Sequence, residues 1–101
     1  MRKFRFPRLI GNREQFAALL TDQQVPASLT GELVVALCRD LLVASPTVAD
    51  EVVRDLIGRR GAAEVALIGA PEQFVADVKE AAGRHGFPER VFVGDPVLMG
   101  I

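Results

Sequence analysis

Two uninterrupted apolar runs constrain the fold of this chain more than any other feature. Residues 33–38 (LVVALC) and 65–68 (VALI) contain no polar position. A strand without polar alternation is covered on both faces, as the central strands of parallel sheets are. Each run leads, after a short connection, into a pattern that is typical of an amphipathic helix. This order favours an α/β fold in which helices join parallel strands.

The sequence also marks where the helices start. Asn12 with Gln15 three residues later is a capping signal, and Ser45 before Pro46 places a hydroxyl cap ahead of a proline at the first helical position. A third helix is expected after Pro71. The apolar faces predicted for the three helices are Phe16, Leu19 and Leu20; Val48, Val52, Val53, Leu56 and Ile57; and Phe74, Val75, Val78, Ala81 and Ala82. The solvent side of the second helix is predicted to carry Asp50, Glu51 and Asp55.

Two further strands complete the pattern. Phe4, Phe6 and Ile10 lie at even spacing, as in a half-exposed strand, and Pro7 places this strand at the edge of a sheet. Residues 91–93 (VFV) form a short last strand. The order β-α-β-α-β-α-β predicts a mostly parallel four-stranded sheet with helices, in one α/β domain spanning residues 1–101.

Composition narrows the class of protein. Half of the 101 residues are apolar and a quarter are charged, which is typical of a globular domain. The apolar runs are too short to cross a membrane, and the charges scattered through residues 1–13 are unlike a secretory leader. The single cysteine excludes an internal disulfide. We therefore expect a cytoplasmic protein that does not associate with membranes.

The charges are unevenly distributed along the chain. Residues 1–13 carry five cationic side chains and no acidic one, whereas the whole chain has a formal net charge of −1. A basic arm with two interleaved phenylalanines is compatible with binding to nucleic acid or to an acidic partner. The favoured interpretation is a first strand with its charges on the outer face, because nucleic-acid binders are usually basic over a whole domain.

Residues suited to catalysis or to metal binding are few. His85, the only histidine, lies near a helix end, where a capping role is favoured over catalysis. One histidine cannot build a two-histidine metal site, and the carboxylates lack the spacing of a calcium loop. Cys38 ends a buried strand, and packing is favoured over a nucleophilic role. Neither a P-loop nor a GxGxxG motif occurs, so we expect no enzyme activity, no cofactor and no metal.

The start of the second helix is the strongest candidate site. Ser45 is expected to cap this helix, and Thr47 lies in its first turn. A phosphate placed there would meet unpaired backbone N–H groups and the positive end of the helix dipole. Its charge would alter a docking surface without any catalytic machinery. The alternative is that both hydroxyls serve only to start the helix.

The same segment resembles a known family. After a hydrophobic strand, residues 45–51 read Ser-Pro-Thr-Val-Ala-Asp-Glu. This is similar to the Ser-x-Ser-Phe-Ala-Asp-Glu helix start of a divergent STAS-like family of unknown function, and the resemblance to STAS domains covers residues 8–93. In the STAS domains of anti-sigma-factor antagonists that helix starts with Asp-Ser-Ser-Gly. Ser45 then falls on the aspartate, Pro46 on the first serine, Thr47 on the serine that accepts phosphate and Val48 on the glycine.

The resemblance implies a non-enzymatic regulatory module that binds a protein partner, such as an ATP-binding serine kinase that doubles as an anti-sigma factor. Phosphorylation of Thr47, or of Ser45, would switch this binding off. The docking face would be centred on the start of the Thr47 helix. Its contacts would come from Asp40, Pro46, Val48 and Asp50.

Two other interpretations remain open. The chain could be an assembly subunit that forms a homo-oligomer through the edge strand at residues 4–10 or through the apolar tail at residues 97–101. Alternatively, a small ligand or a substrate could bind at the carboxyl edge of the sheet, around Cys38 and Gly69.

Overall fold

The computed structural model describes residues 1–94, so the predicted apolar tail at 97–101 lies outside the described residues. The main sheet has four parallel strands in the order β1-β3-β5-β6. These strands are β1 (Arg2–Arg5), β3 (Leu33–Leu37), β5 (Glu64–Ile68) and β6 (Val91–Gly94). The predicted α/β class and the predicted parallel sheet are therefore confirmed.

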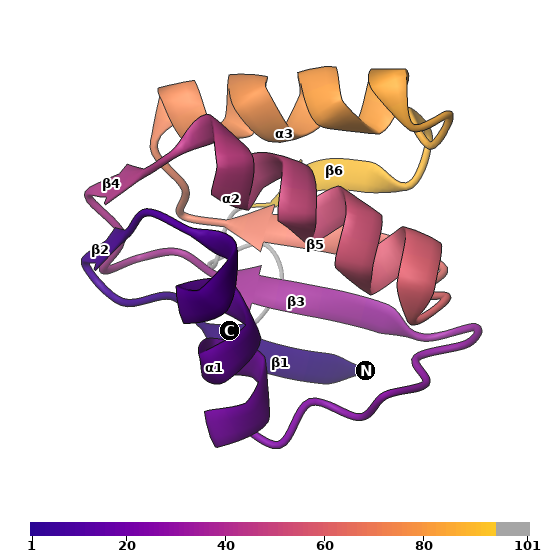
Figure 1. Ribbon diagram of the computed structural model, residues 1–101. Helices are drawn as coiled ribbons and strands as arrows, with labels where there is room; N and C mark the ends of the chain where they lie inside the picture. The colour runs from indigo at the N-terminus through magenta and orange to yellow at the C-terminus, as the bar shows by residue number, and fades with distance from the viewer. Residues whose placement is uncertain (95–101) are drawn as a thin grey trace.

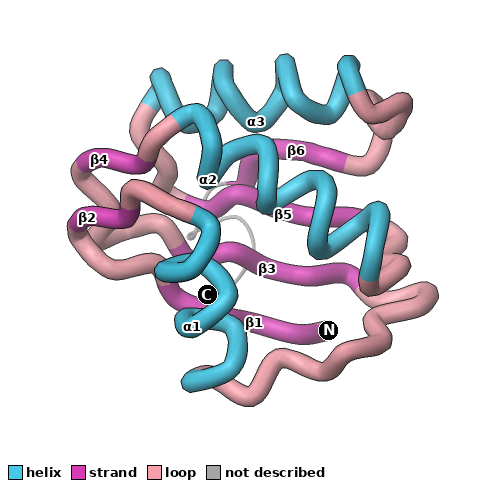
Figure 2. Tube along the Cα trace, in the orientation of Figure 1, coloured by secondary structure: helices cyan, strands magenta, loops and turns pink. Residues whose placement is uncertain are grey.

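The helices lie on one face of this sheet (Figures 1 and 2). They are α1 (Arg13–Asp22), α2 (Pro46–Glu51), which continues as the π-helical segment η1 (Val52–Arg59), and α3 (Glu72–Arg84). Neighbouring strands of the sheet follow one another along the chain, and crossovers between parallel strands share one hand. A sheet built in this order therefore receives all its crossover helices on the same face.

The core lies between the sheet and these helices. Phe6 is 1% exposed, and its ring centroid lies 6.0 Å from that of Phe16 on α1 and 5.4 Å from that of Phe74 on α3. On the opposite face of the sheet, Val35 and Ala66 are also fully buried. The two central strands are therefore covered on both faces, as the unbroken apolar runs predicted.

The predicted first strand is divided in two. β1 ends at Arg5, Pro7 follows it, and a second short strand, β2 (Leu9–Ile10), pairs in parallel with β4 (Val43–Ala44). The backbone oxygen of Arg8 accepts hydrogen bonds from the N–H groups of Leu42 (2.8 Å) and Val43 (3.2 Å). The prediction of one strand through residues 4–10 is thus wrong. The prediction that the first strand lies at the sheet edge is confirmed, since β1 is one of the two edge strands of the main sheet.

Two acidic residues expected on the solvent side of the second helix are buried. The side chains of Glu51 and Asp55 are 8% and 5% exposed. The Asp55 carboxylate accepts hydrogen bonds from Arg59 (3.0 Å) and Arg60 (2.9 Å). Glu51 forms ion pairs with two further arginines, one of them Arg13 on α1. Burial is tolerated because each carboxylate keeps charged hydrogen-bond partners.

The predicted helix starts are confirmed. The Asn12 side chain accepts a hydrogen bond from the Gln15 backbone N–H (2.8 Å), and Ser45 caps α2 with Pro46 at the first helical position. Within residues 1–94, no helix combines the length and the apolar character that crossing a membrane requires.

Candidate functional site

Ser45 is tied into the structure by its hydroxyl. Its Oγ donates to the backbone oxygen of Gly11 (2.8 Å) and accepts from the Val48 N–H (3.3 Å). Its own N–H donates to the backbone oxygen of Ile10 (3.2 Å). Ser45 therefore fastens the start of α2 to the end of β2. A phosphate on this hydroxyl would replace the proton that Oγ donates and so break the contact with Gly11.

Thr47 lies two residues further on, in the first turn of α2, and its side chain is exposed, as is that of Pro46. Within residues 1–94, its hydroxyl makes no hydrogen bond with another side chain or with the backbone. The predicted phosphate acceptor is thus on the surface at an amino-terminal turn. Of the two candidate hydroxyls, Thr47 is the one that can be modified without loss of a structural contact.

Val48 and Asp40, two other predicted docking residues, differ in exposure. Val48 is fully buried in the main core, so the prediction that its side chain contacts a partner is wrong. The helical periodicity that places Val48 on the apolar face is what decides its position. Asp40 is exposed in the loop between β3 and β4, at the ends of the sheet strands.

Asp50 joins α2 to the end of α3. Its Oδ1 accepts a hydrogen bond from Arg84 (3.1 Å) and lies 2.8 Å from Nε2 of His85, the residue that caps α3. Burial acts to raise the pKa of the Asp50 carboxyl, but the hydrogen bonds and charges of His85 and Arg84 outweigh it and hold this pKa below its usual value. Asp50 therefore serves the contact between two helices.

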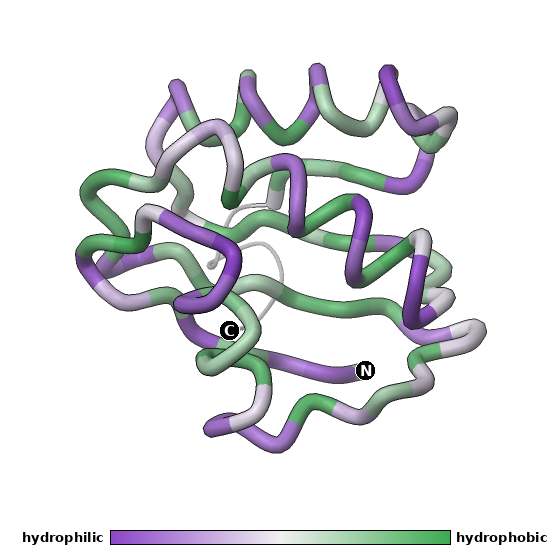
Figure 3. The backbone as a smooth tube through the Cα atoms, viewed as in Figure 1, coloured by the Kyte–Doolittle hydropathy of each residue, from purple (hydrophilic) through white to green (hydrophobic). Residues whose placement is uncertain are grey.

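Three large apolar side chains are exposed beside the start of α2. Leu9, Leu42 and Val43 are 66%, 59% and 61% exposed. Leu9 and Val43 are direct partners in the β2–β4 pair, and Leu42 precedes Val43, so the three belong to one short ribbon (Figure 3). We call this set the apolar ridge. The sequence signal was the apolar run at residues 41–43, of which only Leu41 is buried.

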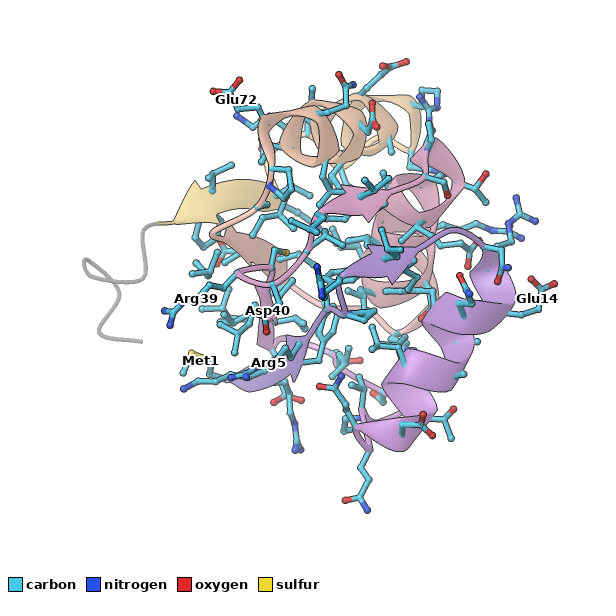
Figure 4. The ribbon with its side chains drawn as sticks, turned by 90° about the vertical axis from the view of Figure 1, so that its left-hand side faces the viewer. Met1, Arg5, Glu14, Arg39, Asp40 and Glu72 are labelled. Atoms are coloured by element: carbon cyan, nitrogen blue, oxygen red, sulfur yellow. The ribbon has the colours of Figure 1, made fainter. Side chains whose placement is uncertain are left out.

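A hollow of about 1030 Å³ opens at the carboxyl edge of the sheet, where the strands end. We call it the arginine groove. It is lined by Arg5, Arg8, Arg39, Phe6, Pro7, Leu19, Gln23, Asp40 and Leu42. Figure 4 looks onto this edge and labels Arg5, Arg39 and Asp40. These three residues also line a second hollow of about 300 Å³ that extends to Ile68 on β5.

Cys38 does not supply a reactive thiol at this edge. It is fully buried, and burial raises the pKa of its thiol to about 12, although a backbone hydrogen bond from Ile68 acts in the opposite direction. The thiol therefore stays protonated at neutral pH, and the Cys38 side chain packs in the core.

Comparison with known proteins adds no assignment. No family model matches the chain, and neither a curated protein nor a solved structure matches it. The resemblance to STAS domains therefore stays a prediction. Among residues 1–94, no cluster of three histidine, cysteine or acidic side chains is placed to hold a metal ion.

Proposed function

We propose that this protein is a small regulatory module that docks a protein partner through the apolar ridge and the start of α2. The observation that carries the proposal is the exposure of Leu9, Leu42 and Val43 together on one ribbon. Exposed apolar side chains that gather in one place mark interaction surfaces, because contact with a partner removes them from water.

The ridge is held in a fixed position, which suits a docking surface. The backbone oxygen of Arg8 accepts two hydrogen bonds from the ridge, and the Ser45 N–H donates to Ile10 at the end of β2. The hydroxyl of Ser45 adds a fourth hydrogen bond, to the backbone oxygen of Gly11. A partner therefore meets preorganised apolar side chains, which lowers the entropy lost on binding.

Phosphorylation of Thr47 is the proposed control. Thr47 follows the ridge in the chain by four residues and is exposed, so a phosphate on it would add a charge of about −1.5 to −2 beside apolar contacts. Burying that charge against a partner carries a desolvation cost, so the modified protein would bind more weakly. A serine/threonine kinase that recognises this surface would be both partner and modifying enzyme, as the STAS resemblance implies.

Self-association through β1 is the less favoured alternative. The outer edge of β1 carries Arg2, Lys3 and Arg5, and pairing of two such strands would bring like charges together. The Gln23 side-chain amide also occupies this edge, since it donates to the Arg5 backbone oxygen and accepts from the Arg5 N–H, both at 2.7 Å. These features disfavour the pairing of a further strand with β1.

The proposal is tested by isolating the tagged protein from the cells in which it is made, followed by peptide mapping by mass spectrometry. We expect a fraction that carries one phosphate on Thr47 and an unphosphorylated fraction that retains a stoichiometric protein partner. The Thr47→Ala protein should lack the phosphate and keep the partner. The Leu9→Ser/Val43→Ser protein should lose the partner.

Two results would contradict the proposal. One is that the partner stays bound to folded Leu9→Ser/Val43→Ser protein. This result would show that the apolar ridge is not part of the interface. The other is the complete absence of phosphate on Thr47 while a serine/threonine kinase is bound. This result would show that phosphorylation of Thr47 does not control binding. Circular dichroism of each variant shows whether the fold is intact.

A further inference from the structure

The arginine groove contains cationic side chains that no carboxylate within residues 1–94 neutralises. Within residues 1–94, Arg5, Arg8 and Arg39 form no ion pair, whereas six of the other arginines pair with carboxylates. The one acidic side chain that lines the groove is Asp40, and it too forms no ion pair within this range. The groove is therefore positively charged on a chain whose formal net charge is −1.

The backbone under these arginines is fixed. Gln23 holds both backbone hydrogen-bonding groups of Arg5 at 2.7 Å, and Arg8 is bonded to the ridge. Arg39 packs against Gly69, whose φ of +70° is a backbone conformation that favours glycine, and a Cβ there would lie at ordinary contact distance (3.5 Å) from the Arg39 Cα. The three arginines thus line one hollow from anchored backbone positions.

The groove offers apolar contacts as well as charge. Its lining includes Leu19, Leu42 and Pro7, and Leu42 belongs also to the apolar ridge. A ligand that carries only negative charge would leave these side chains unused. A segment with acidic side chains next to an apolar one would use both.

We propose that the arginine groove docks an acidic segment of a protein partner, with carboxylates on Arg5, Arg8 and Arg39 and an apolar side chain against Leu19 and Leu42. This inference rests on the proposed function and names the chemistry of the partner. Arginine binds a carboxylate with two parallel hydrogen bonds, which gives such a contact geometric specificity.

An acidic peptide fits the groove better than nucleic acid does. The aromatic side chain that lines the groove, Phe6, is 1% exposed and packs in the core. Bases of a single strand bind by stacking on exposed aromatic faces, and Phe6 offers none.

The test is fluorescence anisotropy with a short labelled peptide in which aspartate and glutamate alternate with leucine, at low salt. The matched peptide replaces each acidic residue by its amide. We expect the acidic peptide to bind at least about tenfold more tightly than the amide peptide, with an affinity that falls as salt rises. The Arg5→Gln/Arg39→Gln protein and the Arg8→Gln protein should each bind the acidic peptide several-fold more weakly.

Arg90→Gln is the matched control. Arg90 is exposed, forms no ion pair within residues 1–94 and lies beside Phe87 at the opposite end of the strands, so its loss makes the same charge change as Arg8→Gln but away from the groove. Equal weakening by Arg90→Gln would overturn the proposal, because it would show attraction by net charge alone. Equal affinity for the amide peptide would overturn it as well.

Two competitors separate this proposal from other ligands. If citrate displaced the peptide at the same concentration as the unlabelled peptide itself, the groove would be a small-anion site and the proposal would be wrong. If oligo-dT bound more tightly than the peptide with the same arginine dependence, the ligand would be nucleic acid.

The cellular partner distinguishes the failure of this inference from the failure of the proposed function. Loss of the partner from both the Leu9→Ser/Val43→Ser and the Arg5→Gln/Arg39→Gln proteins supports both. If only the Arg5→Gln/Arg39→Gln protein retains the partner, the groove proposal is wrong and the ridge remains the docking surface. If both variants retain the partner, the groove proposal and the proposed function are both wrong.

Discussion

The arginines on the helix side of the molecule and those at the carboxyl edge of the sheet differ in how their charge is neutralised. Arg60 and Arg13 bind the buried carboxylates of Asp55 and Glu51. At the carboxyl edge, Arg39 and its neighbours have no such partner within residues 1–94. The same side chain is thus a structural element in one region and an available binding group in the other.

The two regions separate charges that stabilise the fold from charges that are available for recognition. A carboxylate buried with an arginine must keep that partner, because an unpaired charge in the core is costly. An exposed arginine without a carboxylate costs the fold little. Where an anchored backbone also holds it in place, it is available to an external ligand. Substitutions among the buried ion pairs should therefore lower stability strongly, whereas substitutions in the arginine groove should lower binding and leave stability nearly unchanged.

The largest expected effect is that of Asp55→Ala. Asp55 as a whole residue is 3% exposed. Its removal leaves the Arg60 guanidinium without its carboxylate, although this group also donates to the backbone oxygens of Val25 and Pro26. We expect the free energy of unfolding to fall by about 3 kcal/mol. Urea denaturation measures the change, and a loss below about 1 kcal/mol would remove the contrast between the two regions.

A smaller loss is expected for Ser45→Ala. The substitution removes the hydroxyl that caps α2 and binds Gly11, and we expect a loss of about 1 kcal/mol. Thr47→Ala, two residues away, should change stability by less than about 0.5 kcal/mol because the side chain is exposed. Equal losses in the two variants would indicate that Thr47 has a structural contact after all.

Asp50→Asn should remove part of the contact between α2 and α3. The folded state holds the pKa of Asp50 below its ordinary value of 3.8, so ionised Asp50 stabilises the fold above that pH. This stabilisation is lost as the pH falls through the lower, folded-state pKa. Near neutral pH we expect Asp50→Asn to lower the free energy of unfolding by less than about 1 kcal/mol, because Asp50 and Arg84 are partly exposed. The difference in stability between the two proteins should shrink below pH 3.8; a difference that grows there would reverse the assigned sign.

The smallest effects on stability are expected in the arginine groove. Arg39→Gln and Arg8→Gln should each change the free energy of unfolding by less than about 0.5 kcal/mol, since exposed side chains without partners contribute little. Thermal unfolding of these variants beside Asp55→Ala gives the comparison directly. A loss above about 1.5 kcal/mol in either variant would mean that the groove serves the fold.

Local patterns determined how much of the fold could be predicted from the sequence. The apolar runs, the Asn12 and Ser45 caps and the helical periodicities depend on residues close together in the chain, and the structure confirms them. The division of the first strand at Pro7 was missed. It depends on the pairing of β2 with β4, which lies more than thirty residues away in the chain.

The burial of Asp55 and the arginine groove were missed for the same reason. Burial of Asp55 is made possible by Arg60, whose guanidinium is in turn held by a distant loop. The groove forms only when the end of β1 meets the loop that carries Arg39. The excess of positive charge in residues 1–13 was the available signal, but it could not show that Arg39 joins it.

The side-chain Nε–H groups of the arginines offer the most direct measurement, because NMR can record their hydrogen exchange in one sample. Arg60, whose Nε donates to Asp55 at 2.9 Å, should exchange slowly in the free protein. Arg5, Arg8 and Arg39 should exchange rapidly and become protected when the acidic peptide is added. Protection of these three in the free protein, or rapid exchange that the peptide leaves unchanged, would contradict the account.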